Sequence, residues 1–506
     1  MAKPKSKPQL SLYSAPVTDQ AAGMGPEHWS RRFFEWIRCA FDDAQFADLY
    51  QEGGRYPVSP GLLACIMILQ YMFRVSDRVA VEATIMRRDW RMALGLGDDW
   101  EGFDPSVLSY FRRRLGPAEQ QQRIFNRVLE QMEGLGLLRG RRRVRVDATH
   151  VLADVARLNR ADAIQEALRV VVEALYEGCP ELRCDPEFER LYSMYGEAVW
   201  LGCGSQSDGR LVLLGQDGYR LLALCGARDV RGKATLERML AENFVRSAGE
   251  ELSPVPLEQR PSDHIESPHD PDARVGKKGS QVWVGEKVHL AETAETGETN
   301  VILQVRVTDP RIEDSTVLGE IVEGVRAVLP ETDTILADGG YASASNSVAL
   351  ASDGLDLVSP PRPNTSRSQL AATEFAIDMA QQQARCPEGH TSTFWSPSGG
   401  TIRIRFPAAA CAACPRRAEC TTSPQGRSLN ISLQYDQLQR DRARAADPAF
   451  RILYRLRAGI EATFSQLVHR CGLRRNRYRG APRRKLHIVL AATALNVWRL
   501  LQWAAA

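Results

Sequence analysis

Alternating apolar and polar positions, typical of half-buried strands, recur in the middle of the chain. Residues 143–148 alternate, and residues 282–293 and 300–308 alternate on either side of a turn at 295–298, which predicts a hairpin. A helical spacing follows, in which Val317, Ile321 and Val325 lie on one side of residues 313–329. Short strands at 334–337 and 355–358 enclose a short helix, and apolar helices are expected from Pro448 and over 485–503. This order predicts an α/β domain with a mixed sheet.

Upstream of this region the apolar spacing is helical. Residues 60–73 form a continuous apolar run, residues 79–92 predict another helix, and Asp104 with Pro105 is a helix-start signal. The helix that follows carries three consecutive arginines, Arg112, Arg113 and Arg114. A basic late helix occurs in DNA-binding helix-turn-helix domains. A purely packing helical domain is an equally open reading, because a sequence does not fix helix crossing angles.

Breaks in these patterns suggest the domain boundaries. Residues 153–200 are expected to be mostly helical and residues 202–280 irregular, with several Gly, Ser and Pro breaks. A stretch rich in Ser, Pro, Gln and Cys interrupts the α/β pattern. The expected division is a flexible arm (1–25), a helical DNA-binding domain (27–135), the first part of the catalytic domain (141–359), a Cys-rich insertion (360–447), and a last segment with the catalytic helix, a basic stretch and a C-terminal helix (448–506).

Composition narrows the class of protein. The chain has 506 residues, 44% of them hydrophobic and 25% charged, which is enough for two to four structural units. The first residues lack the basic start, apolar core and cleavage site of a secretion signal, and the apolar run 61–73 is too short for a bilayer span. We therefore expect a soluble protein in the cytoplasm.

Charge distribution is more informative than the net charge of +3. Between Arg470 and Lys485, eight of sixteen residues are Arg or Lys and none is acidic. A second basic run, 139–145, leads directly into Asp147. Such runs suit a polyanionic partner, although any one of them could be a solvated helix face.

Three carboxylates stand at positions where chemistry could occur. Asp147 and Asp338 each end an expected strand, and Glu461 flanks the apolar stripe of a long helix. If the three converge, they could hold two divalent cations that clamp the attacking and leaving oxygens of a phosphodiester. Mg²⁺ prefers such hard oxygen ligands, and carboxylates held this close would repel one another without a cation between them.

Each carboxylate also has an ordinary explanation. Asp147 could simply end a strand, and Asp338 before Gly-Gly could be no more than turn chemistry. Glu461 could form an i, i+4 ion pair with Arg457 on a solvated helix face. Taken singly, none of the three is decisive.

Four of the eleven cysteines cluster in the insertion, whereas the other seven are scattered and suit buried small residues. The spacing of the cluster is that of a structural zinc site, with His390 as a possible substitute ligand. Few apolar residues surround it, so a metal could supply order that a small core cannot. An unmetallated knuckle or a redox-active pair is the alternative. The expected zinc ligands are Cys386, Cys411, Cys414 and Cys420.

Several segments together resemble the DDE transposases of bacterial insertion sequences. Residues 454–461 (Tyr-Arg-Leu-Arg-Ala-Gly-Ile-Glu) resemble their Y-x-x-R-x-x-x-E helix signature, residues 335–341 their second-Asp motif, and residues 144–149 their first. Residues 267–289 are similar to the family's hairpin lead-in, and 55–114 to its helical N-terminal domain. The resemblance runs in order from about residue 30 to 500.

The resemblance implies roles for individual residues. Asp147, Asp338 and Glu461 become catalytic ligands of Mg²⁺ or Mn²⁺ in a ribonuclease-H-like core, and Tyr454 becomes an orienting residue. DNA contacts are expected from the arginines of the late helix, the signature and the basic stretch, namely Arg112, Arg113, Arg114, Arg457, Arg470, Arg474, Arg475 and Arg477.

Two positions depart from the family pattern. Val468 replaces a Lys expected seven residues after Glu461, so Arg470 is the nearest substitute for its DNA contact. Glu286 stands where an aromatic residue is usual. The expected activity is cleavage at transposon ends and strand transfer, with terminal inverted repeats and target DNA as partners and at least a dimer on DNA. A catalytically inactive DNA-binding derivative and a nuclease without strand transfer remain alternatives.

Overall fold

The computed structural model describes residue 25 and residues 27–50, 58–97, 99–155, 158–196, 208–247, 251–361 and 370–503. Its centre is a mixed sheet in the order β6-β5-β1-β7-β8, with β4 paired to the first part of β5. Strand β5 is antiparallel to both of its neighbours, β1 and β6, whereas β7 and β8 run parallel to β1. The strands are β1 (Arg143–Leu152), β4 (Arg274–Lys278), β5 (Gln281–Thr293), β6 (Ile302–Thr308), β7 (Thr334–Ala337) and β8 (Asp356–Val358).

The expected α/β core with a helical N-terminal region is confirmed, and most of its elements lie where the alternation predicted them. The hairpin forms as β5 and β6, and the strand expected at 334–337 is β7. The helix expected at 313–329 is α12 (Asp314–Val328), and α13 (Ala344–Ser352) is the short helix between β7 and β8. These strands and helices follow the binary pattern because the sheet buries its apolar positions against helices.

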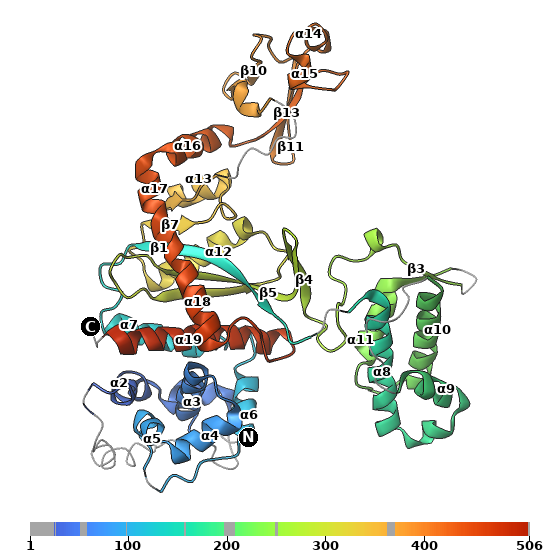
Figure 1. Cartoon of the computed structure of the whole chain (residues 1–506), viewed down its shortest axis with the longest axis vertical. Helices are drawn as coiled ribbons and strands as arrows, with labels where there is room; N and C mark the ends of the chain where they lie inside the picture. Colours follow the sequence, from blue (N-terminus) through green and yellow to red (C-terminus); the bar gives the residue numbers. More distant parts are fainter. Residues whose placement is uncertain are drawn as a thin grey trace.

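The first and last helices of the chain share one hydrophobic core with the sheet. Helix α19 (Ala481–Trp503) contacts β6 and the N-terminal helices α3 and α7, and in Figure 1 it lies between the sheet and α3. Helix α3 (Pro60–Phe73) is buried on almost every side, as its continuous apolar run predicts. The other N-terminal helices are α2 (Trp29–Trp36), α4 (Asp77–Met86), α5 (Arg88–Leu94), α6 (Ser106–Arg114) and α7 (Arg123–Gly134).

Two long helices expected from the sequence are interrupted. The helix expected over 79–92 is wrong as one element, because the backbone turns extended at Arg87 and separates α4 from α5. The helix expected from Pro448 consists of α17 (Pro448–Tyr454), a 3₁₀ turn η7 (Arg455–Ala458) and α18 (Gly459–Cys471). Arg457 therefore lies in the 3₁₀ turn and Glu461 in the first turn of α18. Because a 3₁₀ turn has about three residues per turn, the two side chains are not spaced as on one continuous α-helix.

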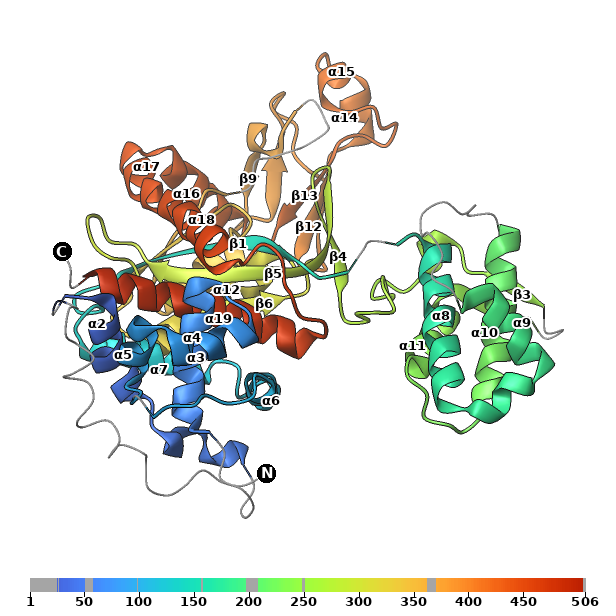
Figure 2. The same cartoon turned by 60° about the horizontal axis from the view of Figure 1, so that its bottom comes forward.

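A helical unit with its own hydrophobic core lies between β1 and β4. It stands to one side of the sheet in both views and is connected to it by the chain on either side (Figures 1 and 2). Residues 202–280 were expected to be irregular, and this prediction is wrong where the structure has two helices, α10 and α11. Their bounds and those of the earlier two are α8 (Arg160–Gly178), α9 (Pro186–Tyr195), α10 (Asp208–Cys225) and α11 (Lys233–Asn243).

Glycines explain why α10 did not read as a helix. Gly215 and Gly218 lie inside it, and each would have read as a break. A Cβ on Gly215 would lie 2.5 Å from a methyl of Leu252, and one on Gly218 would lie 2.8 Å from a methyl of Leu240. The glycines therefore allow β3 (Leu252–Pro254) and α11 to pack closely against the helix.

The Cys-rich segment forms a small unit beyond α13 and α16 (Tyr435–Ala446), at the end of the molecule opposite the N-terminal helices (Figure 1). It contains a two-stranded and a three-stranded antiparallel sheet. Within the described ranges no helix is long and apolar enough to span a bilayer. The elements of the unit are β9 (Ala376–Asp378), β10 (Gln383–Arg385), β11 (Phe394–Ser398), β12 (Thr401–Arg405), β13 (Ser428–Ser432), α14 (Ala408–Ala412) and α15 (Arg417–Cys420).

Candidate active site

The two aspartates lie side by side at the sheet. Val146 of β1 pairs in parallel register with Ala337 of β7, so Asp147 and Asp338 are the next residues on two neighbouring strands. Asp147 is buried and its backbone neighbour Ala148 donates its N–H to the carboxylate at 2.7 Å. Asp338 accepts a hydrogen bond from the N–H of Gly340 at 2.8 Å. The sheet topology thus brings together two residues that are 191 positions apart in the sequence.

Arg457 connects Asp147 to Glu461. Its Nη2 lies 2.5 Å from Asp147 Oδ2, and its Nη1 lies 3.7 Å from Glu461 Oε1. The i, i+4 ion pair with Glu461 therefore forms, although the Glu461 side chain is 69% exposed and that of Asp147 is 13% exposed. Because the guanidinium lies between the two carboxylates, it occupies a position where a cation would be stabilised.

The surroundings favour protonation of Asp147 more than is usual for an aspartate. Burial raises its pKa, and the charge of Asp338 raises it further, whereas Arg457 and the N–H of Ala148 lower it. Burial also raises the pKa of the Tyr454 hydroxyl, to which Arg457, Asp338 and Asp147 are all near enough to contribute. Tyr454 is therefore a neighbour of the acidic pair, as expected of an orienting residue.

A fourth carboxylate, Asp314 at the start of α12, lies near Asp338. A Cβ on Gly340 would lie 2.9 Å from both Asp314 Oδ2 and Asp338 Oδ1, so the absence of a side chain there lets the two carboxylates approach. Lys287 Nζ lies 3.0 Å from Asp314 Oδ1 and balances its charge. Apart from its place in the first turn of an expected helix, nothing in the sequence distinguishes this residue.

The carboxylates as placed do not form a finished metal site. Among the residues that the structure describes, no group of three or more His, Cys, Asp or Glu side chains is arranged to hold a metal ion. Asp147, Asp338 and Glu461 have the hard oxygen donors that Mg²⁺ prefers, but Arg457 is ion-paired with both Asp147 and Glu461. The donor types therefore fit a divalent cation, whereas their present arrangement is that of an arginine-paired cluster.

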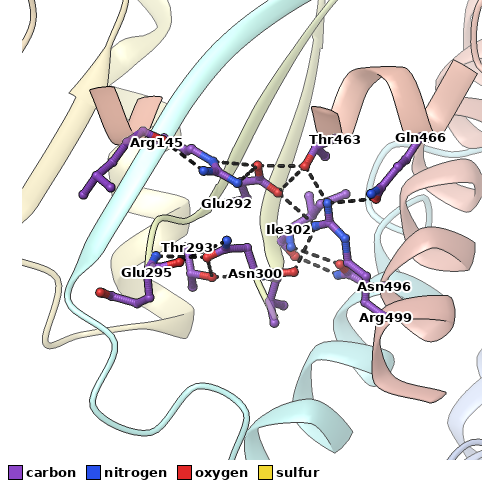
Figure 3. A network of polar contacts seen from close by, with 12 residues as sticks. Arg145, Glu292, Thr293, Glu295, Asn300, Ile302, Thr463, Gln466, Asn496 and Arg499 are labelled. Carbon is purple, nitrogen blue, oxygen red and sulfur yellow. Dashed lines mark hydrogen bonds and ion pairs between the residues drawn. The ribbon is translucent and has the colours of Figure 1, made fainter. Parts of the chain in front are cut away.

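Behind the acidic residues, a buried polar network joins the strand of Asp147 to the helix of Glu461 (Figure 3). Glu292 of β5 has no exposed surface and accepts hydrogen bonds from Arg145 Nε at 2.7 Å, Arg499 Nη1 at 2.9 Å and Thr463 Oγ1 at 2.7 Å. Arg145 also donates to the carbonyl of Leu456 in η7 at 2.9 Å. Since Arg145 is two residues before Asp147 and Thr463 two after Glu461, the network fixes one element against the other.

Glycine at position 459 is required by this network. A side chain there would collide with the guanidinium of Arg145. The Gly459 inside the helix signature is therefore explained by the close approach of Arg145 to the start of α18, which sequence reasoning did not identify.

The arginines expected to contact DNA fall into two groups. Arg113, Arg470, Arg475 and Arg477 are exposed, and Arg114 and Arg474 are half-buried. Arg112 is buried and ion-paired with Asp77, which weighs against its role as a DNA contact. Arg457 is occupied by Asp147.

The basic stretch runs beside the end of β1. The N–H of Leu152 donates to the carbonyl of Arg474 at 3.0 Å, and the N–H of Asn476 donates to the carbonyl of Leu152 at 2.8 Å. Five residues of strand, about 17 Å, separate Leu152 from Asp147. Arg484 within this stretch is buried and ion-paired with Asp270 and with Glu286, the residue that departs from the family pattern.

Charge is distributed unequally among the units. Residues 433–503 contain 15 Arg or Lys and 4 Asp or Glu, whereas residues 158–265, the helical unit, contain 12 and 18. The positive potential that would attract a polyanion therefore surrounds the candidate active site and not the helical unit.

The four cysteines of the Cys-rich unit lie near one another, although not in a ligand arrangement. Burial raises the pKa of the Cys420 thiol, and Cys411, Cys414 and Cys386 are all close enough to raise it further. Cys386 and His390 are joined by a tight turn in which Gly389 has a φ of +83°.

Comparison with known families gives two matches. Residues 22–114 match the family described as Transposase domain (DUF772), and residues 385–501 match the family described as Transposase DDE domain. The second match covers Glu461 and the four cysteines, whereas Asp147, Asp338 and the helical unit lie outside both. No curated protein and no solved structure matches the chain. The two matches confirm the resemblance to DDE transposases of insertion sequences and place the chain among DNA transposases in general.

Proposed function

We propose that this protein is a DNA transposase that cleaves phosphodiesters at transposon ends and joins the freed ends to target DNA. The observation that carries the proposal is the convergence of Asp147 and Asp338 on neighbouring strands, with Glu461 connected to Asp147 through Arg457. Two acids that are far apart in the sequence lie on neighbouring strands, and a third is connected to them through an arginine, while a strongly basic stretch runs beside the end of β1.

The sheet order supports a ribonuclease-H-like core. Three antiparallel strands (β6, β5, β1) are followed by two strands parallel to β1. Asp147 lies within the central strand β1, and Asp338 directly follows the neighbouring strand β7. Since such a core hosts several phosphoryl transfers, the fold alone does not select transposition. The two transposase-domain matches support transposition over the other transfers.

Asp147, Asp338 and Glu461 would hold Mg²⁺ or Mn²⁺, as a pair of ions, once Arg457 releases Asp147. Such ions would supply charge neutralisation at the phosphate and a more acidic attacking water or hydroxyl. The residues of the chain have their own tasks. Arg457 would turn from Asp147 to a phosphate of the DNA end, Tyr454 would orient that end, and the exposed arginines among 470–477 would hold the backbone.

The Cys-rich unit would bind a structural zinc ion through Cys386, Cys411, Cys414 and Cys420, with His390 as a substitute. Support comes from the proximity of the four thiols and from the small core of the unit. We further propose that the protein acts in the bacterial cytoplasm at the nucleoid and forms at least a dimer on DNA, because joining two ends requires both to be held at once.

The test is a strand-transfer assay. Purified protein is incubated with Mg²⁺ or Mn²⁺, a fragment bearing the terminal inverted repeats of its element, and a target plasmid. Joined products that disappear with Asp338→Asn support the proposal. Cleavage without joining would indicate a nuclease, and binding without cleavage an inactive DNA-binding derivative, so either result would overturn the proposal.

A further inference from the structure

The outer face of the three-stranded sheet β11-β12-β13 has no role in the site described above. In β12, Ile402 and Ile404 point inward and are buried with Leu429 and Ile431 of β13. Successive side chains of a strand point to opposite faces, so the intervening residues point outward. The registers place these outward residues in three rows: Phe394, Arg405 and Ser428; Ser396, Arg403 and Asn430; Ser398, Thr401 and Ser432.

This outer face carries positive charge without an acidic residue among its nine positions. Arg403 and Arg405 are exposed, and within residues 370–503 of the described chain neither has a carboxylate within ion-pair distance. By contrast, Arg416 in the same unit is paired with Glu419 at 3.1 Å. The face therefore presents two unneutralised guanidinium groups.

The remaining residues of the face are hydrogen-bond donors and one exposed aromatic ring. Five Ser or Thr hydroxyls and the amide of Asn430 can donate hydrogen bonds. Phe394 is 42% exposed, and the guanidinium of Arg405 lies 5.0 Å from the centre of its ring. Phosphate oxygens in nucleic-acid complexes are contacted by Arg, Ser, Thr and Asn, the side chains present here.

We propose that the outer face of β11–β13 binds the phosphate backbone of DNA, an inference that rests on the transposase function proposed above. Charge complementarity selects this occupant, because the face offers cations and donors and no acceptor carboxylate. Arg403 and Arg405 are two residues apart on one strand, about 7 Å, so both can contact the same DNA strand. Binding of this kind is independent of base sequence.

Hydrogen bonds fix this sheet relative to the candidate active site. β13 leads into α16, where the Ser347 hydroxyl of α13 donates to Asp441 Oδ2 at 2.9 Å. Ser345 Oγ donates to Gln434 Oε1 at 2.8 Å, just after β13. Because α13 follows directly on Asp338, DNA on the sheet face has a defined path relative to that carboxylate.

The test measures DNA affinity of the full chain across a series of salt concentrations, by fluorescence anisotropy with a labelled duplex. An Asp338→Asn background prevents cleavage. The double variant Arg403→Gln/Arg405→Gln is compared with Arg385→Gln/Arg416→Gln, which removes the same charge from the same unit outside the face. We expect the face variant to lower the slope of log K against log salt by about two, equally for a terminal repeat and a random duplex. The control pair leaves the slope unchanged, and Arg403→Lys/Arg405→Lys restores it.

Three results would overturn the inference: equal slopes for the face variant and the unchanged protein, equal losses in the face and control variants, or a loss confined to the terminal repeat. A change of oligomeric state in ultracentrifugation without a change in slope would assign the face to a second copy of the chain. Failure of the transposase proposal can be distinguished from failure of this inference. If the face variant changes the salt slope but the unchanged protein joins no ends in the strand-transfer assay, the DNA-binding face stands and the transposase proposal fails.

Discussion

Glu292 and Asp147 are both buried carboxylates that face an arginine, but their environments are not equally complete. Glu292 accepts hydrogen bonds from two arginines and a threonine (Figure 3). Asp147 has one arginine and one backbone N–H, and its neighbour Asp338 has the same charge sign, which contributes to its raised pKa. A carboxylate whose partners are complete holds a fold together, whereas one with a like-charged neighbour leaves a position for a ligand.

The largest expected effect is on catalytic activity, which should depend on the acidic pair of Asp147 and Asp338 far more than on Glu292. Asp338→Asn should lower end cleavage by about a thousandfold, since several kcal/mol of transition-state stabilisation depends on that carboxylate. Glu292→Gln keeps the shape and most of the hydrogen bonds, and should lower cleavage by less than tenfold. Single-turnover cleavage of a labelled end measures both. Equal losses would show that the two carboxylates do not differ in kind.

The free energy of unfolding, in contrast, should depend more on Glu292 than on the acidic pair. Glu292→Ala should lower the free energy of unfolding by about 3–5 kcal/mol, because it leaves Arg145 and Arg499 buried without their partner. Glu130→Ala is the control: its side chain is 58% exposed and its partner Arg127 is 32% exposed, so the change should cost less than about 1 kcal/mol. Urea denaturation followed by tryptophan fluorescence measures the change. A Glu292→Ala protein as stable as the control would contradict the structural role.

His487 extends the comparison to a buried group without an opposite charge. Burial lowers its pKa from 6.5 to about 3, so it stays neutral against the hydroxyl of Tyr71 at 2.9 Å. The unfolded chain binds a proton below pH 6.5 and the folded chain does not, so stability is lost as the pH falls from 6.5 towards 3. We expect a loss of a few kcal/mol between pH 7 and pH 4.5, and a smaller loss in His487→Gln. Denaturation midpoints across this pH range provide the measurement, and identical profiles would refute the assignment.

Arg457 gives the smallest of these effects. Arg457→Gln removes the cation that pairs with Asp147, so Mn²⁺ should bind about tenfold more tightly in the absence of DNA. Calorimetric titration of the DNA-free protein measures this affinity. The matched change Arg455→Gln, at an exposed neighbouring position, should leave it unaltered. Weaker Mn²⁺ binding in Arg457→Gln would show that the arginine supports the metal site and does not compete with it.

The sheet and its acids could be predicted from the sequence because the required information is local. Alternation over 143–148, 282–308 and 334–337 predicted strands that the structure contains. Asp338 directly follows β7 as expected, whereas the prediction that Asp147 ends its strand is wrong, because β1 continues to Leu152 in its pairing with β5. The order of elements predicted a mixed sheet, but the parallel pairing of β1 with β7 that brings the two acids together is known only from the structure. Their convergence with Glu461 as metal ligands stays a prediction.

The remainder depends on contacts between distant residues. Glu292 sits in an Ala-Glu-Thr stretch that gives no sign of burial, and only the arrival of Arg145, Thr463 and Arg499 from three other elements makes its burial possible. Arg112 reads as a DNA contact beside Arg113, but one helical position turns it inward to Asp77. Helix α10 was missed because its glycines serve packing and not a turn.

The shared core of the first and last helices has a consequence for synthesis. Phe33 and Leu501 belong to one apolar cluster, and Arg32 Nη1 donates to the carbonyl of Leu501 at 3.0 Å. The N-terminal helices therefore leave the ribosome with one side uncovered, and about 370 further residues, roughly 20–75 seconds of synthesis at about 5–20 residues per second, precede its covering by α19. The strand of Asp147 likewise waits for its partners until the helical unit has been made. A chain truncated before α18 and α19 thus lacks Glu461 and the partners that Thr463 and Arg499 give to Glu292.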